Sequence, residues 1–155
     1  MSILPTKILL ATDGSEEAEL ASRTAVDLAK STGSELHVLY VWEAANPYIG
    51  AVELAGDEPV SPRLDAELRR QFDRQAHTML DTETEKVRAA GGTVTQAHLR
   101  TGKAAHEIVV LAEEIGAGLI VMGSRGLGGI RRALMGSVSD SVVRHAHCPV
   151  LVVRQ

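Results

Sequence analysis

The residues best suited to chemistry lie in one glycine-rich stretch, which runs from Gly118 to Ser139 and reads GLIVMGSRGLGGIRRALMGSVS. A short apolar run leads into it, and a serine-led segment with a helical pattern follows. Glycine lets a backbone approach a ligand without a Cβ in the way. Backbone N–H groups in such a turn, with those of the next helix's first turn, make an anion site. The stretch therefore predicts a phosphate-binding loop built on five glycines: Gly123, Gly126, Gly128, Gly129 and Gly136.

Polar side chains around these glycines extend the predicted phosphate site. We expect Ser137 to cap the following helix and to donate its hydroxyl, with Asp140 completing a capping-box pair. Arg125, inside the first glycine turn, suits a phosphate or a structural carbonyl. The pair Arg131 and Arg132 is equally consistent with ordinary solvated residues. Helix capping alone contributes about 1 kcal/mol, so Ser137 needs no ligand to account for it.

The spacing of the glycines excludes two common phosphate motifs. A Walker loop needs Gly-Lys followed by Ser or Thr, but Gly102-Lys103 is followed by Ala104. The dinucleotide fingerprint begins at Gly126 but meets Arg131 at its third glycine position. The remaining pattern is Gly123-x2-Gly126-x9-Gly136-Ser137.

This pattern resembles the ATP-binding branch of the universal stress protein family. An ATDGS opening at Ala11 to Ser15 and an HCPVLVV ending at His147 to Val153 extend the resemblance over nearly the whole chain. The resemblance implies that the chain binds ATP, with Mg²⁺ held by the phosphates. It implies a binding site made of Ala11, Thr12, Asp13, Val41, Met122, Gly123, Ser124, Arg125, Gly126, Gly136, Ser137, Val138 and Ser139.

Within that implied site, Asp13 would lie at the nucleoside end and the main chain of Val41 would meet the adenine edge. A carboxylate repels phosphate, so Asp13 is suited to ribose hydroxyls or to Mg²⁺. It is also suited to a turn in which it bonds its own backbone. Ser137 and Ser139 match positions that reach the phosphates in the family.

The rest of the chain predicts a single α/β domain over residues 1–155. Strand-like runs alternate with helical periodicities, which is typical of a Rossmann-like parallel sheet with helices on both faces. The resemblance implies an adenine nucleotide α-hydrolase-like sheet with order 3-2-1-4-5, and ligands then bind where strands one and four diverge. Residues 43–62 break every period and predict a mobile surface loop. The expected strands are Lys7–Thr12, Leu36–Trp42, Val94–Arg100, Leu119–Met122 and Val150–Val153.

Composition limits the partners of the chain. The formal net charge is −4 and aromatic residues make up 3%, which argues against nucleic-acid binding. No apolar run approaches a membrane span and no signal-peptide pattern opens the chain, so we expect a cytoplasmic protein without a membrane partner. The single cysteine, Cys148, fits a reducing compartment, and no histidine or cysteine spacing predicts a metal site.

Catalysis has little support in the sequence, because no residue is evident that would position an attacking water. We expect at most a slow ATPase, acting as a nucleotide-dependent regulator of a stress response. In the sheet order that the resemblance implies, Val150–Val153 is an apolar edge strand, and we expect a homodimer through it. One alternative is a nucleotide-independent dimeric interaction module of the same fold. Another, an adenylylating enzyme of the wider superfamily, is disfavoured because HIGH-like and SGGxDS-like segments are missing.

Overall fold

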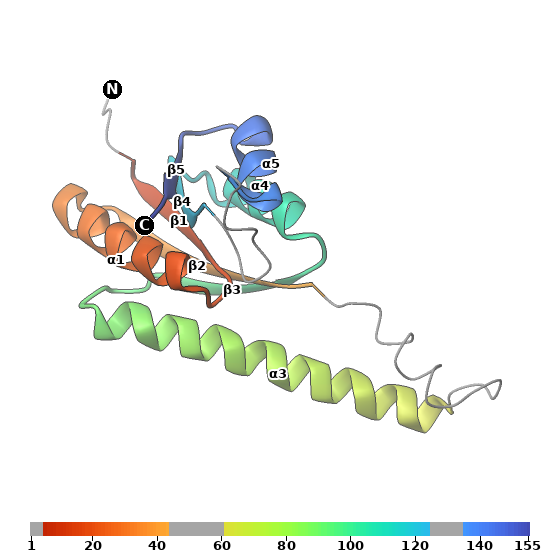
Figure 1. The fold of residues 1–155 in the computed structure, drawn as a ribbon. Coiled ribbons are helices and arrows are strands. Elements are labelled where there is room, and N and C mark those ends of the chain that lie inside the picture. Colours follow the sequence, from red (N-terminus) through yellow and green to blue (C-terminus); the bar gives the residue numbers. More distant parts are fainter. Residues whose placement is uncertain (1–4, 44–60, 125–134) are drawn as a thin grey trace.

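Strands and helices alternate along the chain, as the sequence pattern predicts. The computed structural model describes residues 5–43, 61–124 and 135–155 and has one parallel sheet of order β3-β2-β1-β4-β5 (Figure 1). The predicted α/β class and strand order are confirmed. The strands are β1 (Lys7–Thr12), β2 (Glu35–Trp42), β3 (Gln96–Thr101), β4 (Leu119–Gly123) and β5 (Val150–Val153). The helices are α1 (Glu16–Thr32), α3 (Pro62–Ala89), α4 (Ala104–Ile115) and α5 (Ser137–His145).

The two ends of α1 show how local sequence fixes an element. The Ser15 hydroxyl accepts the N–H of Ala18 at 3.2 Å, and so caps the helix. Gly33 ends it with φ at 70°, the left-handed region that glycine adopts without strain. Each end of α1 is therefore fixed by a residue directly beside it in the sequence.

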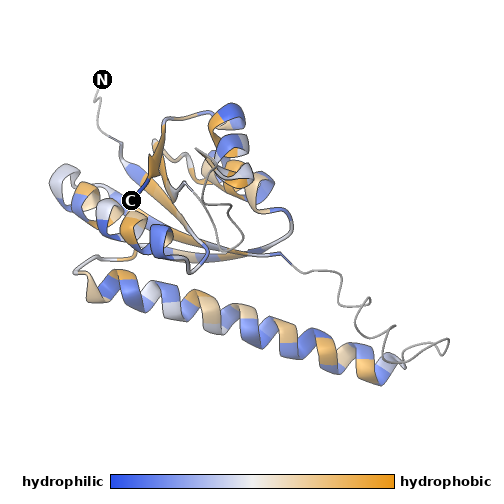
Figure 2. Ribbon diagram, in the orientation of Figure 1, coloured by the Kyte–Doolittle hydropathy of each residue, from blue (hydrophilic) through white to orange (hydrophobic). Residues whose placement is uncertain are grey.

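The alternation of side chains along the strands builds two apolar layers. Leu9 of β1 faces α4 and α5, whereas Ile8 faces α1 and α3. Figure 2 shows apolar residues along the strands and polar residues on the outer sides of the helices. In α1, the fully buried Ala21 and Ala25 allow the helix to lie close to the sheet. Since the two layers cover both faces, only the edges and ends of the sheet remain for a ligand.

Helix α3 is longer than the sheet it covers. Its buried residues, from Ala76 to Val87, all lie in its C-terminal half. The N-terminal half reaches past the end of β2 (Figure 1), and Leu64 there is 45% exposed. Helix α3 therefore lies beside the carboxyl end of the sheet as well as beneath its face.

Some boundaries differ from the sequence predictions. Pro62 is the first residue of α3, capped by Ser61, because proline is well tolerated where a helix needs no N–H donor. Strand β3 begins at Gln96, two residues after the expected Val94. The predicted mobile loop falls mostly on residues 44–60, which lie outside the described residues.

Candidate functional site

The carboxyl ends of β1 and β4 lie side by side at the centre of the sheet. These strands pair in parallel from Ile8↔Leu119 to Leu10↔Val121. Ala11 and Met122, the next residues, are both buried in the same apolar cluster. Helix α1, the next helix after β1, and helix α5, the next helix after β4, lie on opposite faces of the sheet. This is the switch point at which open α/β sheets bind ligands.

The loop between β1 and α1 is fixed by its own side chains. Asp13 Oδ1 accepts a hydrogen bond from the N–H of Ser15 at 2.9 Å. Asp13 thus has the second of its two expected roles, that of a turn residue bonded to the nearby backbone. Gly14 has φ at 82°, so this turn requires glycine. The structure shows no hydrogen-bond partner for Asp13 Oδ2 within the described ranges. The turn role of Asp13 is therefore compatible with a ligand on its second oxygen.

The last residue of β1 is tied to α3. The Thr12 hydroxyl donates to Glu83 Oε2 at 2.8 Å, and Lys86 Nζ donates to Glu83 Oε1 at 2.9 Å. Glu83 is 2% exposed and Thr12 is 6% exposed. Because its side chain points toward α3, Thr12 would meet a ligand at the switch point through its main chain.

Ser124, the residue after β4, joins the first turns of two helices. Its hydroxyl donates to the Glu17 carboxylate in the first turn of α1. Its carbonyl accepts the N–H of Gly136 at 2.6 Å and the hydroxyl of Ser139 at 2.7 Å, both at the start of α5. Hydrogen bonds therefore join Ser124, directly after β4, to the residues that start α5. Ser124 itself is fully buried.

The start of α5 differs from the predicted capping. Gly136, not Ser137, is the N-cap, and no side chain caps the helix. Ser137 is the first helical residue and is exposed, so the capping-box prediction is wrong. Asp140 instead accepts from Arg144 Nε at 3.0 Å. Since a helix leaves its first amides without intrahelical acceptors, the N–H groups of residues 137–139 suit an anion.

Gly123 has a packing reason to be glycine. A Cβ at this position would lie 3.0 Å from the main-chain carbon and Cβ of Glu17. Helix α1 therefore lies too close to the end of β4 for a side chain. Gly123 does not by itself indicate a phosphate.

Val41 lies at the carboxyl edge of the sheet, next to the switch point. Strand β2 pairs with β1 only as far as Thr12↔Tyr40, whereas its pairing with β3 continues to Trp42↔Thr101. Val41 is thus one residue beyond the last β1 pair. Its side chain packs against the α4 and α5 layer.

The comparisons with known proteins agree with this architecture. The family model described as the universal stress protein family matches residues 5–154. The chain belongs to the universal stress protein family. It is 36% identical over 148 residues to the universal stress protein YxiE of Bacillus subtilis (strain 168), covering 96% of this chain and 98% of that protein.

Solved universal stress protein structures share the fold. The universal stress protein UspA from Lactobacillus plantarum superimposes with a TM-score of 0.75 at 27% identity, covering 96% of this chain and 97% of that one. The hypothetical protein MJ0577 gives a TM-score of 0.75 at 29% identity, covering 97% and 96%. A universal stress protein in complex with cAMP and one from Archaeoglobus fulgidus in complex with dAMP are each 23% identical, with TM-scores of 0.66 and 0.63. At that identity the last two show the fold alone.

The site residues expected of a universal stress protein fall into two groups. The first group lies at one end of the sheet, around the switch point. Its residues come from the ends of β1, β2 and β4 and from the start of α5. Arg125 and Gly126 lie outside the described residues, as do Gly128, Gly129, Arg131 and Arg132. No group of three or more histidine, cysteine, aspartate or glutamate side chains that would hold a metal is found within residues 5–43, 61–124 and 135–155. Over the same residues, no helix is both long and apolar enough to cross a membrane.

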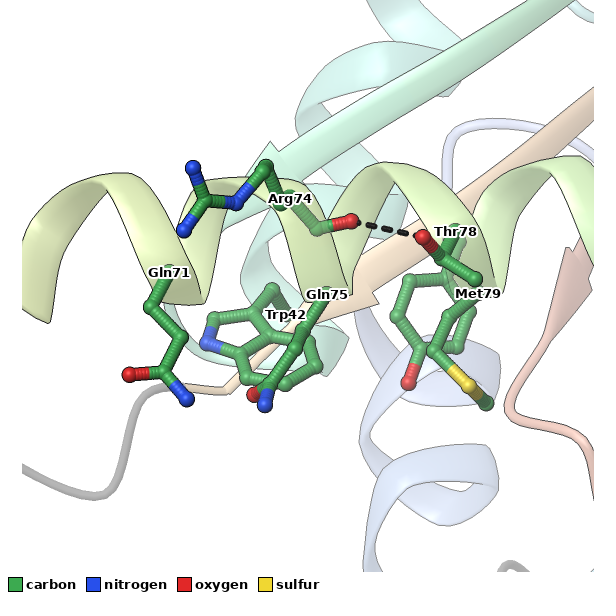
Figure 3. Close-up of a pocket in the computed structure, with 7 residues that line it drawn as sticks. Trp42, Gln71, Arg74, Gln75, Thr78 and Met79 are labelled. Carbon is green, nitrogen blue, oxygen red and sulfur yellow. Dashed lines mark hydrogen bonds between the residues drawn. The ribbon is translucent and has the colours of Figure 1, made fainter.

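A groove beside the switch point was not predicted from the sequence. It has a volume of about 440 Å³ and lies between the end of β2 and α3 (Figure 3). Tyr40, Trp42 and Met79 form its apolar part, and Gln71 and Gln75 hang beside the indole of Trp42. Burial raises the pKa of Tyr40, and the charges of Asp13 and Glu83 raise it further. Strand alternation places Tyr40 and Trp42 on the opposite face of the sheet from Val41.

A histidine pair in β2 and β3 was also missed. His37 Nδ1 lies 3.0 Å from His98 Nε2, and the rings stack with centroids 5.3 Å apart. His37 Nε2 lies 3.3 Å from Glu35 Oε2, so His37 donates to this carboxylate and accepts from His98. Burial lowers the pKa of His98, and the charges of His37 and Arg100 lower it further, against the opposing effect of Glu114.

Proposed function

We propose that this universal stress protein binds ATP, with Mg²⁺ held by the phosphates, between the ends of β1 and β4. The proposal rests on the start of α5. This helix start is hydrogen-bonded to the Ser124 carbonyl, and its amides at residues 137–139 have no capping side chain. Such amides bind phosphate through hydrogen bonds and through the helix dipole. Asp13 and Val41, at the neighbouring strand ends, would then face the nucleoside.

Each side of the implied site has a matching local feature. Among the described residues, Asp13 Oδ2 has no hydrogen-bond partner and would accept from a ribose hydroxyl, and Val41 lies beyond the pairing of β2 with β1. Ser139 uses its hydroxyl on the carbonyls of Ser124 and Gly136, so its phosphate contact would come from its main-chain N–H. Ser137, which is exposed, would offer its hydroxyl to a phosphate. Arg125 and Gly126 belong to the proposed site on the family resemblance alone.

The proposed role is regulation rather than chemistry. We expect turnover far below the roughly 1–100 s⁻¹ of kinases, because the sequence offers no evident residue to position an attacking water. The nucleotide would mark a state of the protein in a cytoplasmic stress response. The single cysteine fits a reducing compartment.

The experiment that tests nucleotide binding is release of ligand from the freshly purified protein. Denaturation followed by chromatography and mass spectrometry should yield adenine nucleotide at close to one per chain. Addition of millimolar Mg·ATP to the emptied protein should raise its melting temperature, because a ligand that binds only the folded state stabilises it. A protein that is empty and gains no thermal stability with Mg·ATP contradicts the proposal.

A nucleotide-independent interaction module is the second candidate, and the environment of Gly123 favours it. The close approach of α1 accounts for this glycine without any phosphate. The same release experiment separates the two functions, since the module would carry no nucleotide.

In either case we propose a homodimer through β5. This strand is at the edge of the sheet, and its Leu151 is 36% exposed. Apolar edge strands pair with other strands unless they are covered. Leu151→Asp should convert the dimer to a monomer in light scattering, while Leu64→Asp, at an exposed position on α3, should not. A dimer that survives Leu151→Asp contradicts this interface.

A further inference from the structure

Glu83 is a buried carboxylate whose two oxygens bind groups from different parts of the chain. Oε2 accepts the Thr12 hydroxyl, 71 residues away, and Oε1 accepts Lys86 Nζ. Its side chain is 3% exposed, whereas that of Lys86 is 42% exposed. Carboxylates are seldom buried this deeply unless they are fully bonded. Glu83 meets that requirement by holding the end of β1.

The contacts of Thr12 carry this connection into the loop that follows. Its hydroxyl also accepts a long hydrogen bond of 3.5 Å from the N–H of Gly14. Gly14 lies directly over α3, since a Cβ there would be 3.5 Å from Glu83 Oε1 and 3.8 Å from Met79 Cε. The turn that carries Asp13 is therefore supported by α3 on one side and by its own hydrogen bonds on the other.

Stability alone is a weak reason for this arrangement. Replacing a buried ion pair with apolar side chains of similar volume is often neutral or stabilising. The neighbours of Glu83 on the buried side of α3, such as Leu80 and Val87, are apolar, and the hydroxyl of buried Thr84 is satisfied within the helix by Leu80 O at 2.7 Å. Directional hydrogen bonds, unlike apolar contacts, fix the position of the group that they hold. The group held here is the end of β1.

We propose that Glu83 is a positioning residue for the nucleotide site, which it serves by holding Thr12 and, through Thr12, the turn that carries Asp13. This inference rests on the proposed function. Helix α3 is thereby part of the support of the site although it lies on the face opposite α5. Loss of the hydrogen bond lets the turn sample other positions, and a ligand must then pay the entropy of ordering it.

The test is calorimetric titration of Mg·ATP into the full chain and its variants. Glu83→Met keeps the volume but removes the acceptor, and Lys86 can turn to solvent. Thr12→Val keeps the shape of the β-branched side chain but removes the donor. Each should weaken binding about tenfold, and the double variant should be no weaker than either single one, because both remove the same bond.

Two further variants separate positioning from general destabilisation. Glu83→Gln retains an acceptor for Thr12 and should recover most of the affinity that Glu83→Met loses. Thr84→Val removes a buried hydroxyl one residue away and should lower the melting temperature without changing the dissociation constant. Fluorescence of Trp42, the only tryptophan, checks that α3 remains seated on β2 in every variant.

Dissociation constants within twofold of the unaltered chain for both Thr12→Val and Glu83→Met overturn the inference, as do fully additive effects in the double variant. If Glu83→Met does not fold, Thr12→Val alone decides. An unaltered chain that binds no Mg·ATP overturns the proposed function and this inference together, whereas binding that is insensitive to both substitutions overturns only the role of Glu83.

Discussion

Two helix starts meet at Ser124, and they are built in opposite ways. Helix α1 is capped by Ser15, carries Glu16, Glu17 and Glu19 in its first turn, and accepts the Ser124 hydroxyl on Glu17. Helix α5 begins at Ser137 and has Gly136 at its N-cap, without a capping side chain. The positive end of α1 is therefore satisfied by its own residues, whereas that of α5, which no capping side chain satisfies, is where we propose that an external anion binds.

The difference in capping explains why we expect only one of the two helix starts to bind phosphate. In the sequence both helices follow a glycine-containing segment after a central strand, and a phosphate site is expected at such a strand end. The acidic residues of α1 repel a phosphate there. Asp140, the acidic residue in the first turn of α5, pairs with Arg144 instead. We therefore expect the capping side chains, more than the fold, to decide which helix start binds a ligand.

The largest expected effect comes from giving α5 a cap like that of α1. Gly136 has φ at −72° and ψ at 163°, a conformation open to any residue. Gly136→Asp should cap the helix and place a negative charge where the phosphates bind. We expect at least a hundredfold loss of Mg·ATP affinity in calorimetry, with the helix content unchanged in circular dichroism.

Gly136→Asn is the matched control, because it caps the same amides without the charge. It should lose about tenfold. If Gly136→Asp binds Mg·ATP as tightly as the unaltered chain, the phosphates do not lie at the start of α5.

The contact of α1 with β4 gives the second prediction. Gly123→Ala should destabilise the fold by about 1–3 kcal/mol in urea denaturation, because its Cβ would overlap the main chain of Glu17. Gly33→Ala is the control, since a Cβ there meets nothing within 4 Å and only its φ of 70° is strained. Gly33→Ala should cost about 1 kcal/mol. Equal stabilities of Gly123→Ala and the unaltered chain would show that α1 can move away from β4.

The two serines at the helix starts give a smaller difference. Ser15→Ala removes a cap and should lower the free energy of unfolding by about 1 kcal/mol. Ser137→Ala should leave it within about 0.5 kcal/mol, because Ser137 is exposed and does not cap α5. Chemical denaturation measures both. A larger loss for Ser137→Ala than for Ser15→Ala would reverse the comparison.

The smallest effect is expected away from both helix starts, at His37 and His98. The pKa of His98 is lowered in the folded protein from its ordinary value of 6.5, so the unfolded chain binds more protons in mildly acidic solution. The stability contributed by His98 is complete above pH 6.5 and is lost as the pH falls toward the lowered value. Denaturation between pH 7.5 and 5.5, with and without Mg·ATP, measures it.

The charged groups around this pair are Glu35, Arg100 and Glu114, and Arg100 pairs with Glu114. His98→Asn should reduce the loss of the free energy of unfolding as the pH falls from 7.5 to 5.5. Because the pair lies toward the amino ends of its strands, the nucleotide should not change the slope. A slope that His98→Asn leaves unchanged assigns the acid sensitivity to other groups.

Local signals in the sequence predict most of the fold. Ser15 and Gly33 mark the ends of α1 because capping and left-handed turns depend on neighbouring residues alone. The strand order is not a local property and came from the family resemblance. The start of α5 was misread because Ser137 and Asp140 resemble a capping box, whereas the closure onto Ser124 places Gly136 at the cap.

The remaining features depend on contacts between distant residues. Thr12 and Glu83 are 71 residues apart, and His37 and His98 are 61 apart, so no local pattern pairs them. Gly123 is explained by the approach of α1, which no glycine motif encodes. For Glu83 the sequence offers one signal, because this residue falls on the same side of its helix as apolar residues. A carboxylate in that position requires a partner.

An amide nitrogen–proton correlation spectrum recorded as Mg·ATP is added to the emptied protein would locate the bound phosphates. We expect the largest shifts at the amides of Ser137, Val138 and Ser139, smaller shifts at Asp13 and Val41, and little change at Glu16 and Glu17. Shifts confined to the start of α1 or to the groove beside Trp42 would contradict the claim that the uncapped helix start binds the phosphates.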